Sequence, residues 1–215
     1  MAKKQEYGNE SIKSLKGAER VRKRPAVIFG SDGIEGCEHS IFEIMSNSID
    51  EAREGYGKKI IITKYLDGSV EVQDFGRGIP VDYNKNEGKF NWELLFCEMY
   101  AGGKYDNGGD NYEFSLGLNG LGLCATQYAS EYMDAEIKSG GYKYTLHFEH
   151  GENVGGLVKE EYKKRGDTGT RIKWKPDLKV FTDINIPVEY FEKTIKRQAI
   201  VNDGIKFVFK NQISS

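Results

Sequence analysis

Hydrophobic residues recur every three or four positions between Ile34 and Gly57, the spacing that places side chains on one face of an α-helix. The segment ends in Gly55-Tyr56-Gly57, and glycine is common just past a helix C-terminus. The pattern therefore predicts one long amphipathic helix in the first quarter of the chain. The residues on its core-facing side are Ile41, Ile44, Met45, Ile49 and Ala52.

Alternating and β-branched runs predict a sheet in the remainder of the chain. Residues 59–65 and 69–74 are two such runs around Leu66-Asp67-Gly68, and Asp-Gly between strands is a hairpin signal. Further strands are predicted at residues 132–138, 142–150, 154–162, 168–175 and 205–209. Shorter helices are predicted over residues 92–100, 121–130 and 188–201.

No internal repeat or low-complexity linker divides these elements, so we predict a single α+β domain. Its architecture would be a two-layer sandwich, with helices covering one face of a mostly antiparallel, mixed sheet. A ligand would then bind between the sheet and the helices.

Composition and charge narrow the class of protein. The 215 residues are 38% hydrophobic and 30% charged, as in globular chains, and no apolar run approaches the ~20 residues that span a bilayer. With 31 basic and 33 acidic side chains, a uniformly basic surface is excluded.

Cys37, Cys97 and Cys124 lack CxxC spacing and are expected to be reduced thiols in helices. The chain begins without an apolar signal segment, so we expect a cytoplasmic protein.

Two segments are locally basic, Lys3–Arg24 and Lys159–Lys175. The first fits either a solvated surface or a segment that meets a partner or phosphate. For the second, few aromatic residues are interleaved with the charges, so we expect only weak, salt-sensitive contact with DNA.

Polar residues at defined spacings indicate a binding site. Glu43 and Asn47 are four residues apart and so share one face of the long predicted helix, although alone they fit a solvated face. Asp74 ends an apolar strand, where its carboxylate can accept hydrogen bonds in a cavity. Gly76 and Gly78 follow it and remove side chains that would obstruct a planar ligand.

Many of the 26 glycines are clustered, at 102–103 and again at 117–122, where they precede a predicted helix. Glycine-rich loops that enter a helix offer backbone N–H groups to phosphates. A dinucleotide-binding fingerprint is excluded, because no parallel βαβ unit surrounds the loop and the acidic ribose-binding residue is missing.

In this order and spacing, the motifs resemble those of the GHKL ATPases, and most closely the N-terminal ATPase domain of bacterial type II topoisomerase B subunits, those of DNA gyrase and topoisomerase IV. The resemblance runs from Tyr7 to about Phe209. It implies the Bergerat ATPase fold and the binding and hydrolysis of ATP with Mg²⁺. The stretches that carry it are Ser11–Gly17, Val21–Pro25, Glu43–Ala52, Val72–Pro80, Ala101–Lys104, Leu118–Gly122 and Thr168–Thr170.

The resemblance also implies a role for each matching residue. Glu43 matches the general base, Asn47 the Mg²⁺ ligand, and Asp74 the carboxylate that receives the adenine amino group, helped by Thr170 through an ordered water. The pocket walls would be Ile44, Val72, Ile79, Leu95 and Ile172. Its edge would be formed by Glu51 paired with Arg77, together with Gly76, Gly78 and Pro80. The lid residues would be Gly102, Gly103, Lys104, Tyr112, Gly117, Leu118, Asn119, Gly120, Leu121 and Gly122.

The same resemblance implies a domain organisation. Residues 1–16 would be an arm that crosses to a second B subunit when ATP binds, and residues 17–215 an ATP-binding domain with a lid at about 100–122. In the family, ATP binding closes a dimer gate and hydrolysis resets it during DNA strand passage. The transducer and cleavage domains are absent here, so we expect a monomeric fragment that binds ATP well and hydrolyses it poorly. The A-type subunit and DNA would be contacted through those absent regions.

Several positions depart from the family pattern: Ser46, Phe75, Leu116, Asn119 and Ser139. Leu116 and Asn119 stand where a glycine and a histidine are usual in the lid, and Ser139 where many members have an arginine at the pocket mouth. Nucleotide binding should survive these changes, whereas lid kinetics and inhibitor binding should differ.

Other functions remain as alternatives. A MutL-like repair ATPase is disfavoured by the Val21–Pro25 and Thr168–Thr170 stretches. A histidine kinase is disfavoured because His39, His147 and His150 lack a two-helix dimerisation pattern and fit surface or structural histidines. A nucleotide-binding module without catalysis would have no need of Glu43.

Overall fold

The computed structural model describes residues 15, 17–99, 122–164 and 166–212. Seven strands form a mixed sheet in the order β7-β6-β5-β8-β2-β1-β9. Neighbouring strands are antiparallel except β1 and β9, which are parallel. The strands are β1 (Lys59–Lys64), β2 (Val70–Asp74), β5 (Ser130–Ser139), β6 (Tyr142–Glu149), β7 (Glu152–Glu161), β8 (Gly169–Pro176) and β9 (Lys206–Asn211).

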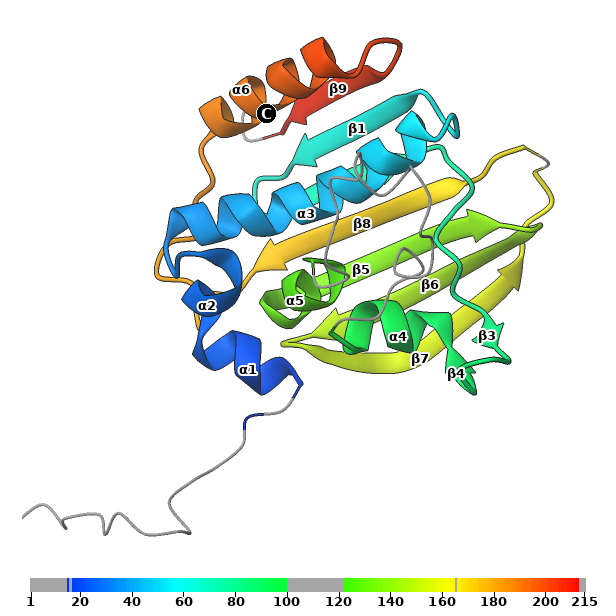
Figure 1. The fold of residues 1–215 in the computed structure, drawn as a ribbon, viewed down its shortest axis with the longest axis horizontal. Helices are drawn as coiled ribbons and strands as arrows, with labels where there is room; N and C mark the ends of the chain where they lie inside the picture. The colour runs from blue at the N-terminus through cyan, green and yellow to red at the C-terminus, as the bar shows by residue number, and fades with distance from the viewer. Residues whose placement is uncertain (1–14, 16, 100–121, 165, 213–215) are drawn as a thin grey trace, which may run out of the picture.

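Helices cover one face of this sheet, as Figure 1 shows. The long α3 contacts β2 and β8 and lies between β1 and β8 in Figure 1, while α5 and α4 lie over the half of the sheet that contains β5 and β6. The predicted two-layer α+β fold is therefore confirmed. The helices are α1 (Ala18–Lys23), α2 (Pro25–Phe29), α3 (Ile34–Arg53), α4 (Asn91–Cys97), α5 (Gly122–Tyr128) and α6 (Val188–Val201).

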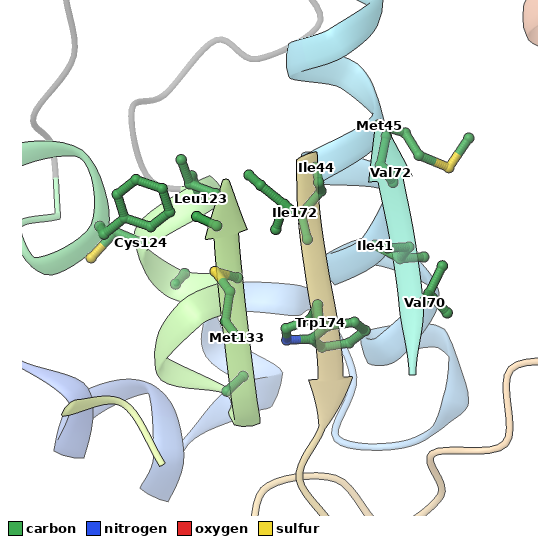
Figure 2. Close-up of a cluster of buried hydrophobic side chains, with 14 of the residues drawn as sticks. Ile41, Ile44, Met45, Val70, Val72, Leu123, Cys124, Met133, Ile172 and Trp174 are labelled. Carbon is green, nitrogen blue, oxygen red and sulfur yellow. The ribbon is translucent and has the colours of Figure 1, made fainter. Parts of the chain in front are cut away.

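The core forms where the apolar face of α3 meets a row of residues across the sheet. Val72 of β2 pairs with Ile172 of β8 and with Ile62 of β1, so their side chains share a face. Ile44 of α3 packs into the same cluster, and Figure 2 shows it beside Val72 and Ile172. Trp174 is fully buried, and its indole N–H donates to the Thr126 carbonyl of α5. This packing fixes α3 and α5 relative to β2 and β8.

The predicted strands and long helix are confirmed, with shifts of a few residues at their ends. The elements that the pattern did not indicate are short: α1, α2, and a small hairpin of β3 (Tyr83–Asn84) and β4 (Lys89–Phe90). Pro25 begins α2 and separates it from α1, so neither helix is long enough to show a helical period. The predicted turn at Asp67-Gly68 is present, with Gly68 at φ +82°.

The basic segment before residue 25 contributes to the fold through Arg22. Its guanidinium donates to the carbonyls of Tyr128, the last residue of α5, and Ser130, the first residue of β5, and forms an ion pair with Asp177. These contacts hold α1 against α5. Arg22 is thus a structural residue rather than part of a solvated basic surface.

The three cysteines are free thiols, one in each of α3, α4 and α5, as predicted. Burial raises the pKa of Cys97 and of Cys124 to about 12, and raises that of Cys37 further. Their thiols are therefore poor nucleophiles at neutral pH. Among the described helices, none is long and apolar enough to cross a membrane.

Candidate functional site

A buried carboxylate lies at the end of β2, where Asp74 is 7% exposed. Its Oδ1 accepts hydrogen bonds from the backbone N–H groups of Gly76 at 3.0 Å and Thr170 at 3.1 Å. Its Oδ2 accepts one from the hydroxyl of Ser48, on α3, at 2.9 Å. Elements from three parts of the chain therefore hold this one side chain.

Burial raises the pKa of Asp74 above its ordinary value, and the nearby Glu51 carboxylate raises it further. The three hydrogen bonds act in the opposite direction, because they favour the ionised form. A buried carboxyl group with a raised pKa is typical of binding and catalytic sites.

The loop after Asp74 packs closely against its neighbours, and two glycines make this possible. A Cβ at Gly76 would overlap the side chain of Glu51, and Gly78 has φ +83° and would place a Cβ 2.7 Å from the Lys138 carbonyl oxygen. The N–H of Ile79 donates to the hydroxyl of Thr170 at 3.1 Å. The loop is thus tied to both α3 and β8.

Arg77 lies on the outside of this loop and makes the predicted pair with Glu51. Its Nε and Nη2 donate to the two Glu51 carboxylate oxygens at 2.9 and 2.7 Å, and Nη2 also reaches Glu54 at 2.6 Å. The guanidinium carbon lies 3.7 Å from the ring centre of Tyr56. Pro80, the last residue of the motif, is exposed beside it.

Glu43 lies on α3 two turns before Glu51, and Asn47 lies one turn after Glu43 and is half-buried. The Glu43 carboxylate Oε1 is 3.1 Å from Nε2 of His39, and the Glu43 side chain is 24% exposed. The ring of Phe29 packs edge-on against His39 at 6.2 Å. The sequence pattern did not indicate this histidine as a site residue, although its i, i+4 spacing to Glu43 was a usable signal.

The predicted apolar wall residues fall into two groups. Ile44, Val72 and Ile172 are buried in the core cluster, on the same side of the sheet as Asp74. Figure 2 shows these three side chains close together between α3 and the strands. Ile79 and Leu95 are only partly buried and pack against that cluster.

Most of the predicted lid lies outside the described residues. This applies to Gly102, Gly103, Lys104, Tyr112, Gly117, Leu118, Asn119, Gly120 and Leu121. Gly122, at the start of α5, is described, and a Cβ there would overlap the Glu43 carboxylate. The absence of a side chain at Gly122 therefore lets α5 approach Glu43 closely.

Two surface hollows lie outside the cluster of candidate site residues Asp74, Glu43 and Asn47. One, of about 580 Å³, is lined by residues 139–142, 161–164 and 166–168, and another, of about 300 Å³, lies over residues of β2, β5, β6, β7 and β8. Neither contains Asp74, Glu43 or Asn47. The candidate site is therefore identified by its buried polar groups and not by the depth of a hollow.

Within the basic segment of residues 159–175, three of the described basic side chains pair with acidic side chains. Lys159 contacts Asp82 at 2.8 Å, Arg171 contacts Glu136 at 3.1 Å, and Lys175 contacts Glu131 at 3.3 Å. These ion pairs offset the local positive charge, which disfavours a DNA-binding surface here.

A profile of the family described as histidine kinase-, DNA gyrase B- and HSP90-like ATPase matches residues 34–180, a range that includes α3, β2 and β8. The chain belongs to this ATPase family. The family assignment is consistent with the site, because the matched range contains Glu43, Asn47, Asp74 and Thr170.

Relatives within this ATPase family include topoisomerase subunits. The chain is 37% identical to the DNA gyrase B subunit of Thermotoga maritima over 210 residues, which are 98% of this chain and 32% of that protein. It is 40% identical to the type 2 topoisomerase B subunit of Aquifex aeolicus over 204 residues, 94% of this chain and 25% of that protein. The chain thus spans about a third or less of the length of these relatives.

Solved structures of similar fold include ATPase domains of a topoisomerase IV and of a gyrase B subunit. The topoisomerase IV ATP-binding domain of Francisella tularensis has a TM-score of 0.77 at 30% identity, covering 93% of this chain and 92% of that one. The 43K ATPase domain of Thermus thermophilus gyrase B, in complex with an aminocoumarin, has a TM-score of 0.78 at 31% identity, covering 94% and 50%. These likenesses confirm the predicted GHKL ATPase fold.

Proposed function

We propose that this chain binds ATP between α3 and the loop after β2, and hydrolyses it. The observation that carries the proposal is the buried Asp74 carboxylate, held at the end of β2 by Ser48, Gly76 and Thr170. An ionised carboxylate only accepts hydrogen bonds, so it suits an exocyclic amino group such as that of adenine. Ile79 and Leu95, which are partly buried beside the core cluster, would contact the base.

Glu43 is the general base of the proposed reaction. Its carboxylate takes the proton of the attacking water, and its contact with His39 holds the carboxylate in one orientation. His39 is in this view a positioning residue, since it acts through Glu43. Phosphoryl transfer depends mainly on such positioning and on neutralising the phosphate charge.

The residues present fit a magnesium ion bound together with the nucleotide. Asn47 follows Glu43 by one turn, and its amide oxygen is a hard ligand of the kind that Mg²⁺ prefers. Within the described ranges, no group of three acidic, histidine or cysteine side chains is placed to hold a metal alone, so the remaining ligands would be phosphates and water. Bound there, Mg²⁺ would neutralise phosphate charge.

The wider role that we propose is supported by the relatives, which are B subunits of gyrase and type 2 topoisomerase. The chain serves as the ATPase domain of such a protein, with residues 1–16 as an arm toward a second B subunit and residues 100–122 as the lid. ATP binding closes a dimer gate and hydrolysis reopens it. The A-type subunit and DNA are contacted outside this chain, and the protein works in the cytoplasm.

Phosphate release from ATP tests this proposal at the level of the chain itself. We expect slow release that requires Mg²⁺ and stops when ATP is replaced by a non-hydrolysable analogue. Absence of any Mg²⁺-dependent phosphate release would contradict ATP hydrolysis by this chain.

The wider role is tested by putting this chain in place of the matching segment of the Thermotoga maritima gyrase B protein. ATP-dependent DNA supercoiling is then assayed with the A-type partner of that protein. An exchanged gyrase B protein that is folded but does not supercoil DNA would contradict the wider role.

Substituting Gly122 with alanine is expected to lower ATP turnover, because the added methyl group would overlap Oε2 of Glu43 and displace the carboxylate. The Glu43 side chain can rotate away, so the cost to the free energy of unfolding should stay within ~1–3 kcal/mol. ATPase assays beside thermal melts measure both effects. Gly33→Ala is the matched control, since its Cβ would come no closer than 3.3 Å to any neighbour. Unchanged turnover in Gly122→Ala would contradict this placement of Glu43.

A further inference from the structure

Ser48 of α3 makes a side-chain hydrogen bond to Asp74, the candidate base-recognition residue. It is 5% exposed, and its hydroxyl donates to Oδ2 of Asp74 at 2.9 Å. It follows Asn47 directly, so one turn of α3 would serve both the metal and the base. The other two described donors to Asp74, at Gly76 and Thr170, are backbone N–H groups, which any substitution other than proline leaves in place.

The hydrogen bonds around Asp74 can be counted against the capacity of its carboxylate. The two oxygens of an ionised carboxylate offer about four acceptor positions. Gly76 and Thr170 use both positions of Oδ1, and Ser48 uses one position of Oδ2. Within the described part of the chain, the donors therefore fill three positions, and the fourth, on Oδ2, is the one that a ligand donor can take.

We propose that Ser48 sets base selectivity, by holding Asp74 as an ionised acceptor with a single position directed at the ligand. Such a group accepts a hydrogen bond from the 6-amino group of adenine and repels the 6-oxo group of hypoxanthine or guanine. Ser48 is a positioning residue, because it acts through Asp74. The inference rests on the proposed ATP site and names the residue that tunes it.

Loss of the hydroxyl changes the carboxyl group in two ways. The side chain loses one of the bonds that orient it, and the ionised form loses a hydrogen bond that favours it. The charged groups of the described residues around Asp74 are Glu51 of α3, which raises its pKa, and Arg77, which pairs with Glu51. A carboxyl group that protonates more readily can donate to a 6-oxo group, so selectivity should fall.

Calorimetric titration with ATP and with ITP, each with Mg²⁺, measures this selectivity in the wild-type chain and in Ser48→Ala. We expect the preference for ATP over ITP to fall by about tenfold in the variant, of the order of one charge-assisted hydrogen bond. The fall in ATP affinity on acidification, which we call the acid limb, should also move to higher pH. Ser40→Ala is the matched control, because Ser40 is fully buried on the same helix but donates to the Gly36 carbonyl.

Ser48→Thr and Ser48→Val keep the experiment decisive if alanine disturbs the fold, since threonine and valine have the same shape and differ by the hydroxyl. Threonine should retain the wild-type ratio and acid limb, and valine should lose both. Equal ratios and equal acid limbs in these two variants would overturn the role of Ser48 while leaving the ATP site intact. Failure of the folded wild-type chain to bind ATP would instead contradict the proposed function itself.

Discussion

Replacing Glu43 with glutamine is expected to abolish ATP hydrolysis while leaving ATP affinity within a few-fold of wild type. Glutamine keeps the size of the side chain and an oxygen that can face His39, whose Nε2 is 3.1 Å from the carboxylate in the wild-type structure. It removes the group that takes the proton from water. Loss of a general base costs about 10²–10⁴-fold in rate. Single-turnover phosphate release measures the rate, and equilibrium dialysis with labelled ATP measures the affinity.

Glu38→Gln provides the control for this substitution. Glu38 is on the same helix, and the described contact at this position uses its backbone carbonyl, which accepts from the Tyr190 hydroxyl. Its turnover should match the wild type. If Glu43→Gln retained turnover, another residue would be the general base. Glu43 would then have only a structural role in packing.

Asp74→Asn is expected to weaken ATP binding without destabilising the fold. The asparagine oxygen can still accept from the N–H groups of Gly76 and Thr170, and the Ser48 hydroxyl can turn to accept from the new amide. The adenine amino group would then face a donor in place of an acceptor. A lost charge-assisted bond costs about 1.5–3 kcal/mol, or roughly 10- to 150-fold in affinity.

The pH dependence of this site has opposite signs for stability and for binding. Burial raises the pKa of Asp74 in the folded state, so its contribution to stability is present at low pH and is lost as pH rises through that pKa. Binding of ATP requires the ionised form, so affinity falls as pH drops through the same pKa. In urea unfolding, the stability trend should appear as a difference between the wild type and Asp74→Asn, because carboxyl groups with a lowered pKa, such as Asp177, act in the opposite direction in both proteins. Dialysis should show the fall in ATP affinity in the wild type and not in Asp74→Asn. A marked loss of stability in the variant would contradict the account.

Periodicity in the sequence was sufficient to predict the long helix, the hairpin of β1 and β2 and the meander, because each is a local pattern of burial. Glu43 and Asn47 could be paired from sequence because residues four apart on a helix share a face. The contacts of Asp74 with Ser48 and Thr170 could not, since they join residues 26 and 96 positions apart. Their meeting depends on how α3 crosses β2 and β8, which tertiary packing decides.

The roles of individual residues came from the resemblance to a known family rather than from the pattern. Gly76 and Gly78 illustrate the difference. The prediction that they clear space for a planar ligand stays a prediction, and the structure adds that Gly76 makes room for the Glu51 side chain and Gly78 for the backbone of β5. This packing reason for each glycine is visible only when its three-dimensional neighbours are known.

The proposed function requires that Asp74 lies in a nucleotide site that uses a metal. Calorimetric titration of the chain with the non-hydrolysable analogue AMPPNP, with and without Mg²⁺, tests it most directly when Asp74→Asn is titrated beside the wild type. We expect saturable binding that is tighter with Mg²⁺ and is lost or strongly weakened in the variant. No binding by the folded wild-type chain, or equal binding by the folded variant, would contradict it.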